Sequence, residues 1–174
     1  MKKVRIGVLG AYRGTSMINY CKRADHAEVV AICDNHTERR EKAAATLGKD
    51  VAVYDNFDDF IEHDMDAVIV ANFFHEHAPF VIRLFERGIH VFCECISNGT
   101  LAEGVQLVKA YENTKSIFML AENYPFSAAL LEAKRLTDEG SFGRILYAEG
   151  EYNHSGPREM LAGLTPFPHH WRGW

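Results

Sequence analysis

A glycine-containing turn and a downstream acid are the first residues whose types and spacing suggest chemistry. The turn lies between an apolar run and a helical pattern and consists of Gly10, Ala11, Tyr12, Arg13 and Gly14. In this context a glycine-rich turn places a pyrophosphate at the N-terminus of a helix. Asp34 follows Gly10 by 24 residues, close to the spacing at which a carboxylate binds an adenosine ribose. The sequence therefore predicts a dinucleotide site.

Each of these residues also has an ordinary structural explanation. Gly10 and Gly14 could form a tight strand-to-helix turn that binds nothing. Asp34 could cap the following helix, for which Thr37 is the predicted N-cap residue. The turn, the helix and the acid occur in the order that a dinucleotide site requires, and this order favours the binding interpretation.

The elements that must position these residues alternate between short apolar runs and helical patterns, which is typical of a parallel sheet covered by helices. The sequence predicts strands at residues 4–9, 29–33, 51–54, 67–71, 89–93 and 117–121. It predicts helices at residues 15–23, 37–47, 56–62, 76–87, 101–112 and 127–139. The predicted fold is a Rossmann-like, doubly wound α/β domain over residues 1–123.

The pattern changes after Gly143. Residues 145–152 alternate between apolar and polar types, which predicts a long strand of a different sheet. Residues 124–174 are therefore predicted to be a linking helix and the incomplete start of an α+β substrate domain. The chain ends at Trp174 in an aromatic, proline-rich stretch, a poor natural terminus, so we expect a truncated protein.

The composition is that of a globular protein with one sizeable core, since 47% of its 174 residues are hydrophobic and 25% are charged. A net charge of −5 argues against nucleic-acid binding, which depends on clustered Lys and Arg. No apolar run approaches the roughly 20 residues needed to span a bilayer. The first residues contain too short an apolar stretch for a signal peptide, so we expect a cytoplasmic protein with no membrane partner.

The four cysteines favour reduced thiols, because Cys33 and Cys93 fall in predicted interior strands. Two groups of residues could each supply part of a metal site: Cys93 and Cys95 with His90, and His75 with His77. Neither set reaches the four-ligand spacing of structural zinc, so we expect no bound metal.

Several short motifs resemble, in order and spacing, the Gfo/Idh/MocA family of oxidoreductases. They are Ile6-Gly7-Val8-Leu9-Gly10, Arg13-Gly14, Ala31-Ile32-Cys33-Asp34, Ala71-Asn72, His75-x-His77-Ala78-Pro79, Gly88-Ile89-His90-Val91-x-Cys93-Glu94 and Ala121-Glu122-Asn123-Tyr124. The resemblance continues to His169-His170-Trp171-Arg172 and spans essentially the whole chain. It implies an NAD(P)-dependent oxidoreductase that acts on a sugar, polyol or related small molecule. The oligomeric state remains open, with a homo-oligomer as one alternative.

The resemblance also implies which residues surround the nicotinamide cofactor. Besides the turn and Asp34, these are Ala71, Asn72, His75, His77, Glu94 and Asn123. For His75 and His77 the alternative is a polar helix start that faces solvent. His77 and Cys95 are the candidate catalytic residues.

Two positions depart from the family pattern. Tyr12 replaces a second turn glycine, and its side chain would obstruct the close approach of the pyrophosphate. Cys95 stands where the family usually has the lysine of Glu-Lys-Pro, and a thiol offers no comparable positive charge for proton transfer. These departures and the incomplete second sheet favour, as one alternative, a non-catalytic dinucleotide-binding protein, and the chain alone is expected to be inactive. The resemblance also leaves a redox-cycling glycosidase as an alternative, because some members of the family use a bound nicotinamide in that way.

The cofactor is predicted to be NAD rather than NADP. Asp34 can accept hydrogen bonds from a ribose diol, whereas it would repel a 2′-phosphate. Arg13 is the counterargument, because its guanidinium could bind that phosphate.

Overall fold

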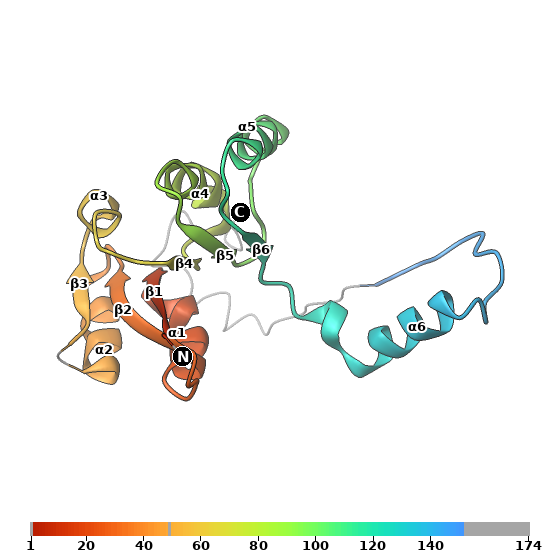
Figure 1. Ribbon diagram of the computed structural model, residues 1–174, viewed down its shortest axis with the longest axis horizontal. Coiled ribbons are helices and arrows are strands. Elements are labelled where there is room, and N and C mark those ends of the chain that lie inside the picture. Colours follow the sequence, from red (N-terminus) through yellow and green to blue (C-terminus); the bar gives the residue numbers. More distant parts are fainter. Residues whose placement is uncertain (1, 49, 152–174) are drawn as a thin grey trace, which may run out of the picture. The chain divides into compact units, whose positions relative to one another are not determined.

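The computed structural model describes residues 2–48 and 50–151, and the chain divides into two units, residues 1–122 and 123–174. The first unit contains a six-stranded parallel sheet (Figure 1). Its strands are β1 (Val4–Leu9), β2 (Ala27–Cys33), β3 (Ala52–Tyr54), β4 (Ala67–Val70), β5 (His90–Cys93) and β6 (Phe118–Leu120). The helices are α1 (Ala11–Cys21), α2 (Thr37–Leu47), α3 (Phe57–Phe60), α4 (His77–Glu86) and α5 (Leu101–Glu112).

The strand order is β3-β2-β1-β4-β5-β6, which confirms the predicted doubly wound Rossmann-like fold. The chain moves outward from β1 to β3 and then returns to add β4 on the other side of β1. Ligands of such sheets bind outside the carboxyl ends of the strands, where the direction reverses. In this unit the reversal lies between β1 and β4.

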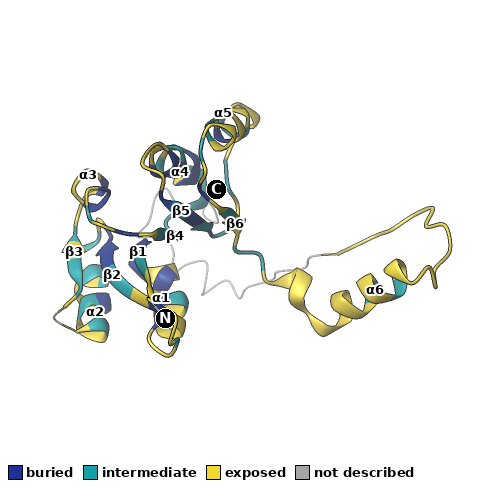
Figure 2. Ribbon diagram, viewed as in Figure 1, coloured by how far each residue is buried: buried dark blue, intermediate teal, exposed yellow. Residues whose placement is uncertain are grey.

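Two apolar clusters cover the two faces of the sheet because successive strand residues point to opposite sides. Val8 packs with Ile18 of α1 on one face, while the adjacent Leu9 packs with Val81 of α4 on the other. Figure 2 shows that the buried residues gather on the central strands and on the sheet-facing sides of the helices. The sheet is thus a rigid base whose carboxyl edge carries the loops.

Helix α1 begins at Ala11, four residues earlier than the sequence predicts. Gly10 alone makes the turn from β1, with a φ angle of 94° in the left-handed region. The N-cap prediction is also wrong, since Thr37 is the first helical residue of α2 and His36 precedes it without a side-chain cap.

The second unit contains a 3₁₀ turn at Tyr124–Phe126 and helix α6 (Ala128–Asp138), which Ser127 caps through the N–H of Leu130. The strand predicted over residues 145–152 is wrong as far as it is described, because residues 145–151 have no regular structure. A strand needs a neighbour for its backbone hydrogen bonds, and the described part of this unit contains no strand. Tyr152 and the motif at 169–172 lie outside the described residues.

Within the described ranges, every helix is too short or too polar to cross a membrane.

Candidate functional site

The residues that follow four neighbouring strands meet at one edge of the sheet. Backbone hydrogen bonds continue past the strand ends: Gly10 donates to Cys33 at 2.8 Å, Ala71 to Leu9 at 2.7 Å and Glu94 to Val70 at 2.8 Å. The glycine turn and the segments that begin at Asp34, Ala71 and Glu94 are therefore held side by side at the carboxyl edge, where ligands of such sheets bind.

Gly10 is the point of closest backbone approach in this edge. A Cβ atom on Gly10 would lie 2.5 Å from the carbonyl carbon of Ala71 and the nitrogen of Asn72. Because real Cβ atoms do not approach backbone so closely, a larger residue would push the turn away from the end of β4. The glycine therefore fixes the turn against the peptide that joins Ala71 to Asn72.

Gly14 makes the second close contact of the turn, with the side chain of Val8. A Cβ atom there would lie 2.5 Å from Cγ1 of Val8, so the glycine lets α1 pack directly on β1. The first turn of α1 contains no acidic residue. The N-terminus of α1, which attracts anions, thus lies at the carboxyl edge of the sheet.

Asp34 joins the end of β2 to the glycine turn. Its Oδ2 accepts a hydrogen bond from the N–H of Ala11 and its Oδ1 accepts one from the N–H of His36, both at 2.8 Å. The residue is only 8% exposed. A carboxylate has about four acceptor positions, so these two bonds leave others for a ribose hydroxyl. The capping and binding interpretations of Asp34 are therefore compatible.

Tyr12 is 73% exposed and leans toward α2, where the guanidinium carbon of Arg39 lies 5.0 Å from the ring centroid. Such a cation–π contact holds the ring to one side. Next to it, Arg40 donates to the carbonyl oxygen of Asp34 at 2.7 Å. Sequence reasoning missed both arginines, although two consecutive basic residues in the first turns of the helix after Asp34 were a usable signal.

Arg13 extends in the opposite direction, toward the end of β5. Its Nε lies 2.6 Å from Oε1 of Glu94, whose side chain is 12% exposed. Since β4 stands between β1 and β5, this ion pair crosses the point between β1 and β4 where the order of strand addition reverses. The guanidinium of Arg13 is thus paired on the far side of β1 from Asp34.

His77 is fully buried at the start of α4. Its Nδ1 lies 2.7 Å from the carbonyl oxygen of Ile96, and its Nε2 lies 3.1 Å from that of Asn72. Burial lowers the pKa of His77, while the backbone carbonyls oppose this shift. A ring with no exposed surface does not reach a substrate, so this geometry does not fit the predicted catalytic role.

Asn72 and His75 lie beside His77 in the segment after β4. The Nδ2 of Asn72 donates to Glu76 at 3.3 Å, while its Oδ1 is buried and accepts no hydrogen bond from any described group. Such an unpaired acceptor suits a ligand that brings a donor. His75 is half-buried, and its ring stacks on that of Phe73 at 5.9 Å.

Cys95 is exposed beside Glu94, with 3.7 Å between its Sγ and Oε2 of Glu94. Partial burial and then the charges of Glu94 and Glu122 raise the pKa of Cys95 above its ordinary value. The thiol is therefore protonated and carries no charge at neutral pH. Asn123 belongs to the second unit, so its predicted contact with the cofactor stays a prediction.

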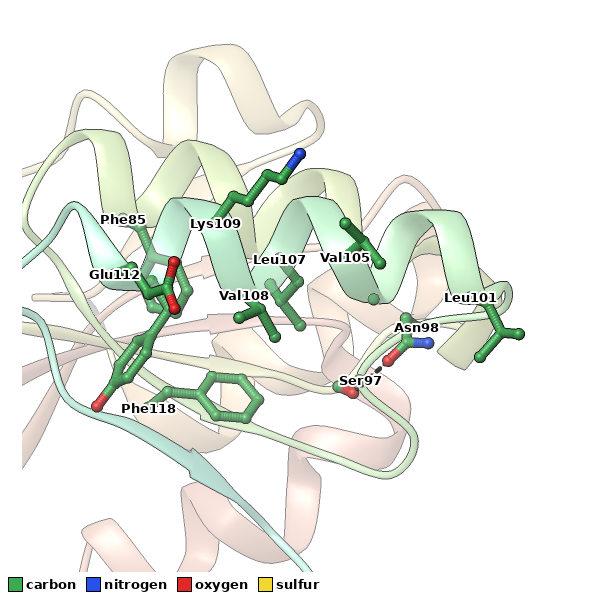
Figure 3. Close-up of a pocket in the computed structure, with 12 residues that line it drawn as sticks. Phe85, Ser97, Asn98, Leu101, Val105, Leu107, Val108, Lys109, Glu112 and Phe118 are labelled. Atoms are coloured by element: carbon green, nitrogen blue, oxygen red, sulfur yellow. Dashed lines mark hydrogen bonds between the residues drawn. The ribbon is translucent and has the colours of Figure 1, made fainter.

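A groove of about 660 Å³ lies elsewhere on the first unit, between α5 and β6 (Figure 3). Figure 3 shows apolar side chains along it, including Leu101, Val105, Val108 and Phe118. The groove contains no arginine and no glycine turn, so it does not suit a charged dinucleotide. No three His, Cys, Asp or Glu side chains gather as metal ligands in the part of the chain that the structure describes.

The sheet topology, the glycine turn and the acid after β2 define a dinucleotide-binding domain of the Rossmann class. The sequence model of an oxidoreductase family, Gfo/Idh/MocA, described as an NAD-binding Rossmann fold, matches residues 4–122. The chain belongs to this family.

Individual relatives agree with the family. The chain is 28% identical over 179 residues to a glycosyl hydrolase family 109 protein of Saccharopolyspora erythraea, a match that covers 97% of this chain and 39% of the relative. It is 26% identical to the WlbA dehydrogenase of Bordetella pertussis, solved in complex with NADH and UDP-GlcNAcA; the TM-score is 0.77, with 82% of this chain and 44% of that chain covered.

A third relative supports the fold alone. Myo-inositol 2-dehydrogenase of Lactobacillus plantarum is 24% identical with a TM-score of 0.76, and the match covers 84% of this chain and 44% of that one. The chain spans about two fifths of the length of the first curated relative.

Proposed function

We propose that this chain binds NAD(H) at the carboxyl edge of its sheet and forms the cofactor-binding part of an oxidoreductase that acts on a sugar or polyol. The observation that carries this proposal is the contact of Gly10 with the Ala71–Asn72 peptide, beside an Asp34 carboxylate that holds the turn. The bound nicotinamide would accept or supply the hydride. Residues 124–174 would begin the substrate domain.

The residues of the edge fit the two halves of such a cofactor. The first turn of α1 would hold the pyrophosphate. The spare acceptor positions of Asp34 would hold the adenosine ribose, and the unpaired Oδ1 of Asn72 and the carboxylate of Glu94 would serve the nicotinamide half. The WlbA relative, whose structure contains NADH and a nucleotide sugar, supports the same cofactor and a sugar-like substrate.

The cofactor preference that we propose is NAD over NADP. A 2′-phosphate would lie against the carboxylate of Asp34, and Arg13 is paired with Glu94 rather than placed to neutralise that phosphate. A cytoplasmic location belongs to the same proposal, because the four cysteines are unpaired thiols, as is usual in a reducing compartment.

Titration of the purified chain with NADH, followed by the change in nicotinamide fluorescence, tests this function. We expect saturable binding that ADP-ribose displaces. A chain that binds neither compound would contradict the proposal. Replacement of Gly10 by Ala should abolish binding through the clash at Ala71, whereas Gly48→Ala, at a glycine with no atom near its Cβ position, serves as the backbone control.

A redox-cycling glycosidase is the second candidate, because the chain resembles a glycosyl hydrolase family 109 protein. The longer protein would then cleave a glycoside without net consumption of NAD. An assay that follows NADH formation and glycoside cleavage side by side separates the two candidates.

A further inference from the structure

We propose that His77 is a positioning residue that fixes the nicotinamide half of the cofactor site by joining two of its segments. The inference rests on the proposed NAD(H) site. His77 itself touches neither cofactor nor substrate, since its side chain is fully buried. It acts through the backbone of Asn72 and of Ile96.

Both contacts of the ring are of hydrogen-bonding length, but a neutral imidazole has one N–H, so the ring donates to one of the two carbonyl oxygens and packs against the other. Nδ1 lies 2.7 Å from the oxygen of Ile96 and Nε2 lies 3.1 Å from the oxygen of Asn72. Asn72 follows β4 and Ile96 follows β5, so a single side chain spans the ends of two neighbouring strands. A shift of the ring would move both segments together.

The side chain of Cys93 in β5 also contacts the ring. The Sγ of Cys93 lies 3.4 Å from Nδ1, and the thiol is fully buried with a pKa that burial raises to about 12. The protonated thiol and the surrounding core pack against the imidazole. The position of the Ile96 and Asn72 carbonyls is therefore set by the core rather than by solvent.

The positions of these segments predict that His77 affects the nicotinamide half of the cofactor site and not the adenosine half. Asp34, at the end of β2, lies on one side of β1, and the segments joined by His77 lie on the other. Asn72, whose backbone oxygen contacts the ring, also carries the buried, unpaired Oδ1. Glu94 lies two residues before Ile96 and pairs with Arg13.

Two nearly isosteric substitutions separate the two contacts. His77→Asn keeps an amide nitrogen near the position of Nδ1, and His77→Gln keeps one near the position of Nε2. Ser116→Ala is the matched control, because Ser116 is a buried polar residue that hydrogen-bonds Thr114 at the amino end of β6, away from the site. The test measures the Kd of NADH and of ADP-ribose, which lacks nicotinamide, for the full chain.

We expect both His77 variants to weaken NADH by about three- to tenfold, the effect of one hydrogen bond, and to leave ADP-ribose within twofold. His77→Asn should lose less, because it retains the shorter contact. Ser116→Ala should change neither ligand. Equal weakening of NADH and ADP-ribose, or no change in either, would overturn the inference.

A measurement on the unsubstituted chain covers the case in which the variants do not fold. The ring nitrogen resonances of His77, followed by NMR with ¹⁵N-labelled histidine, should shift when NADH is added and stay in place with ADP-ribose. Identical spectra with the two ligands would also overturn the inference. If the unsubstituted chain binds neither ligand, the proposed function itself fails, which is a different result.

Discussion

The carboxylate of Asp34 accepts a hydrogen bond from the backbone N–H of Ala11, with 2.8 Å between Oδ2 and the nitrogen. This bond ties the end of β2 to the first residue of α1. The acid that we propose binds the ribose of the cofactor thus also stabilises the glycine turn. We therefore expect cofactor binding and stability to depend on the same carboxylate.

Asp34→Ala should therefore weaken NADH and also lower the free energy of unfolding without ligand, by about 1–3 kcal/mol. The substitution leaves the N–H groups of Ala11 and His36 without a buried acceptor. Thermal unfolding and NADH titration check both effects, with the exposed Asp25→Ala as control. An unchanged melting temperature would show that water replaces the carboxylate.

The chain should bind NADH more tightly than NADPH, because of the charge of Asp34. Arg13→Ala should weaken both cofactors and leave their ratio unchanged, since Arg13 pairs with Glu94 on the other side of β1. Parallel titrations with the two cofactors measure this ratio. Tighter binding of NADPH, or a ratio that depends on Arg13, would assign this guanidinium to the 2′-phosphate.

The stability of the chain should fall as the solution is acidified below about pH 6.5, the ordinary pKa of histidine. Burial lowers the pKa of folded His77, so the unfolded chain takes up a proton before the folded chain does. The stabilisation is present above the unfolded pKa and is lost as the pH falls through the folded pKa.

Urea unfolding at pH 7.5 and pH 5.5 measures this loss. His77→Asn should reduce the difference between the two pH values, whereas the exposed His26→Asn should retain it. An equal pH dependence in all three proteins would attribute the effect to other groups.

The chain alone should show no dehydrogenase turnover even when it binds NAD⁺. The protonated, uncharged thiol of Cys95 lacks the charge of the family lysine, and general acid–base groups contribute about 10²–10⁴-fold. Incubation with NAD⁺ and a panel of sugars and polyols, followed at the NADH absorbance, tests this expectation. Substrate-dependent NADH formation that is lost in Cys95→Ala would refute it.

Much of the fold could be predicted from the sequence, because strand order follows from the alternation of elements and from the glycine turn. The start of α1 was misplaced since Gly10 completes the turn in one residue, which no periodicity reveals. The strand predicted over residues 145–152 is absent from the described residues 145–151 for another reason. Alternation marks a segment that could pair, and pairing requires a neighbour.

The site was predictable only in part. The residue types that follow each strand indicated which residues belong to the candidate site. Their side-chain partners were not predictable, because Arg13 pairs with Glu94 and Tyr12 contacts Arg39, both far away in sequence. The burial of His77 was likewise invisible, because a histidine at a helix start is equally consistent with exposure. Contacts between side chains from different loops depend on packing, which short motifs do not encode.

The strand order has a consequence for how the chain acquires its structure. Ile6 of β1 pairs with Ala67 of β4, a residue 61 positions later, and the described sheet contains no hairpin. Every pairing therefore requires closure of a long loop, whose entropy must be lost before any contact compensates it. We expect slow folding for a chain of this size, with the β1–β4 pairing, and hence the edge where the Gly10 turn meets Ala71, among the last features to form.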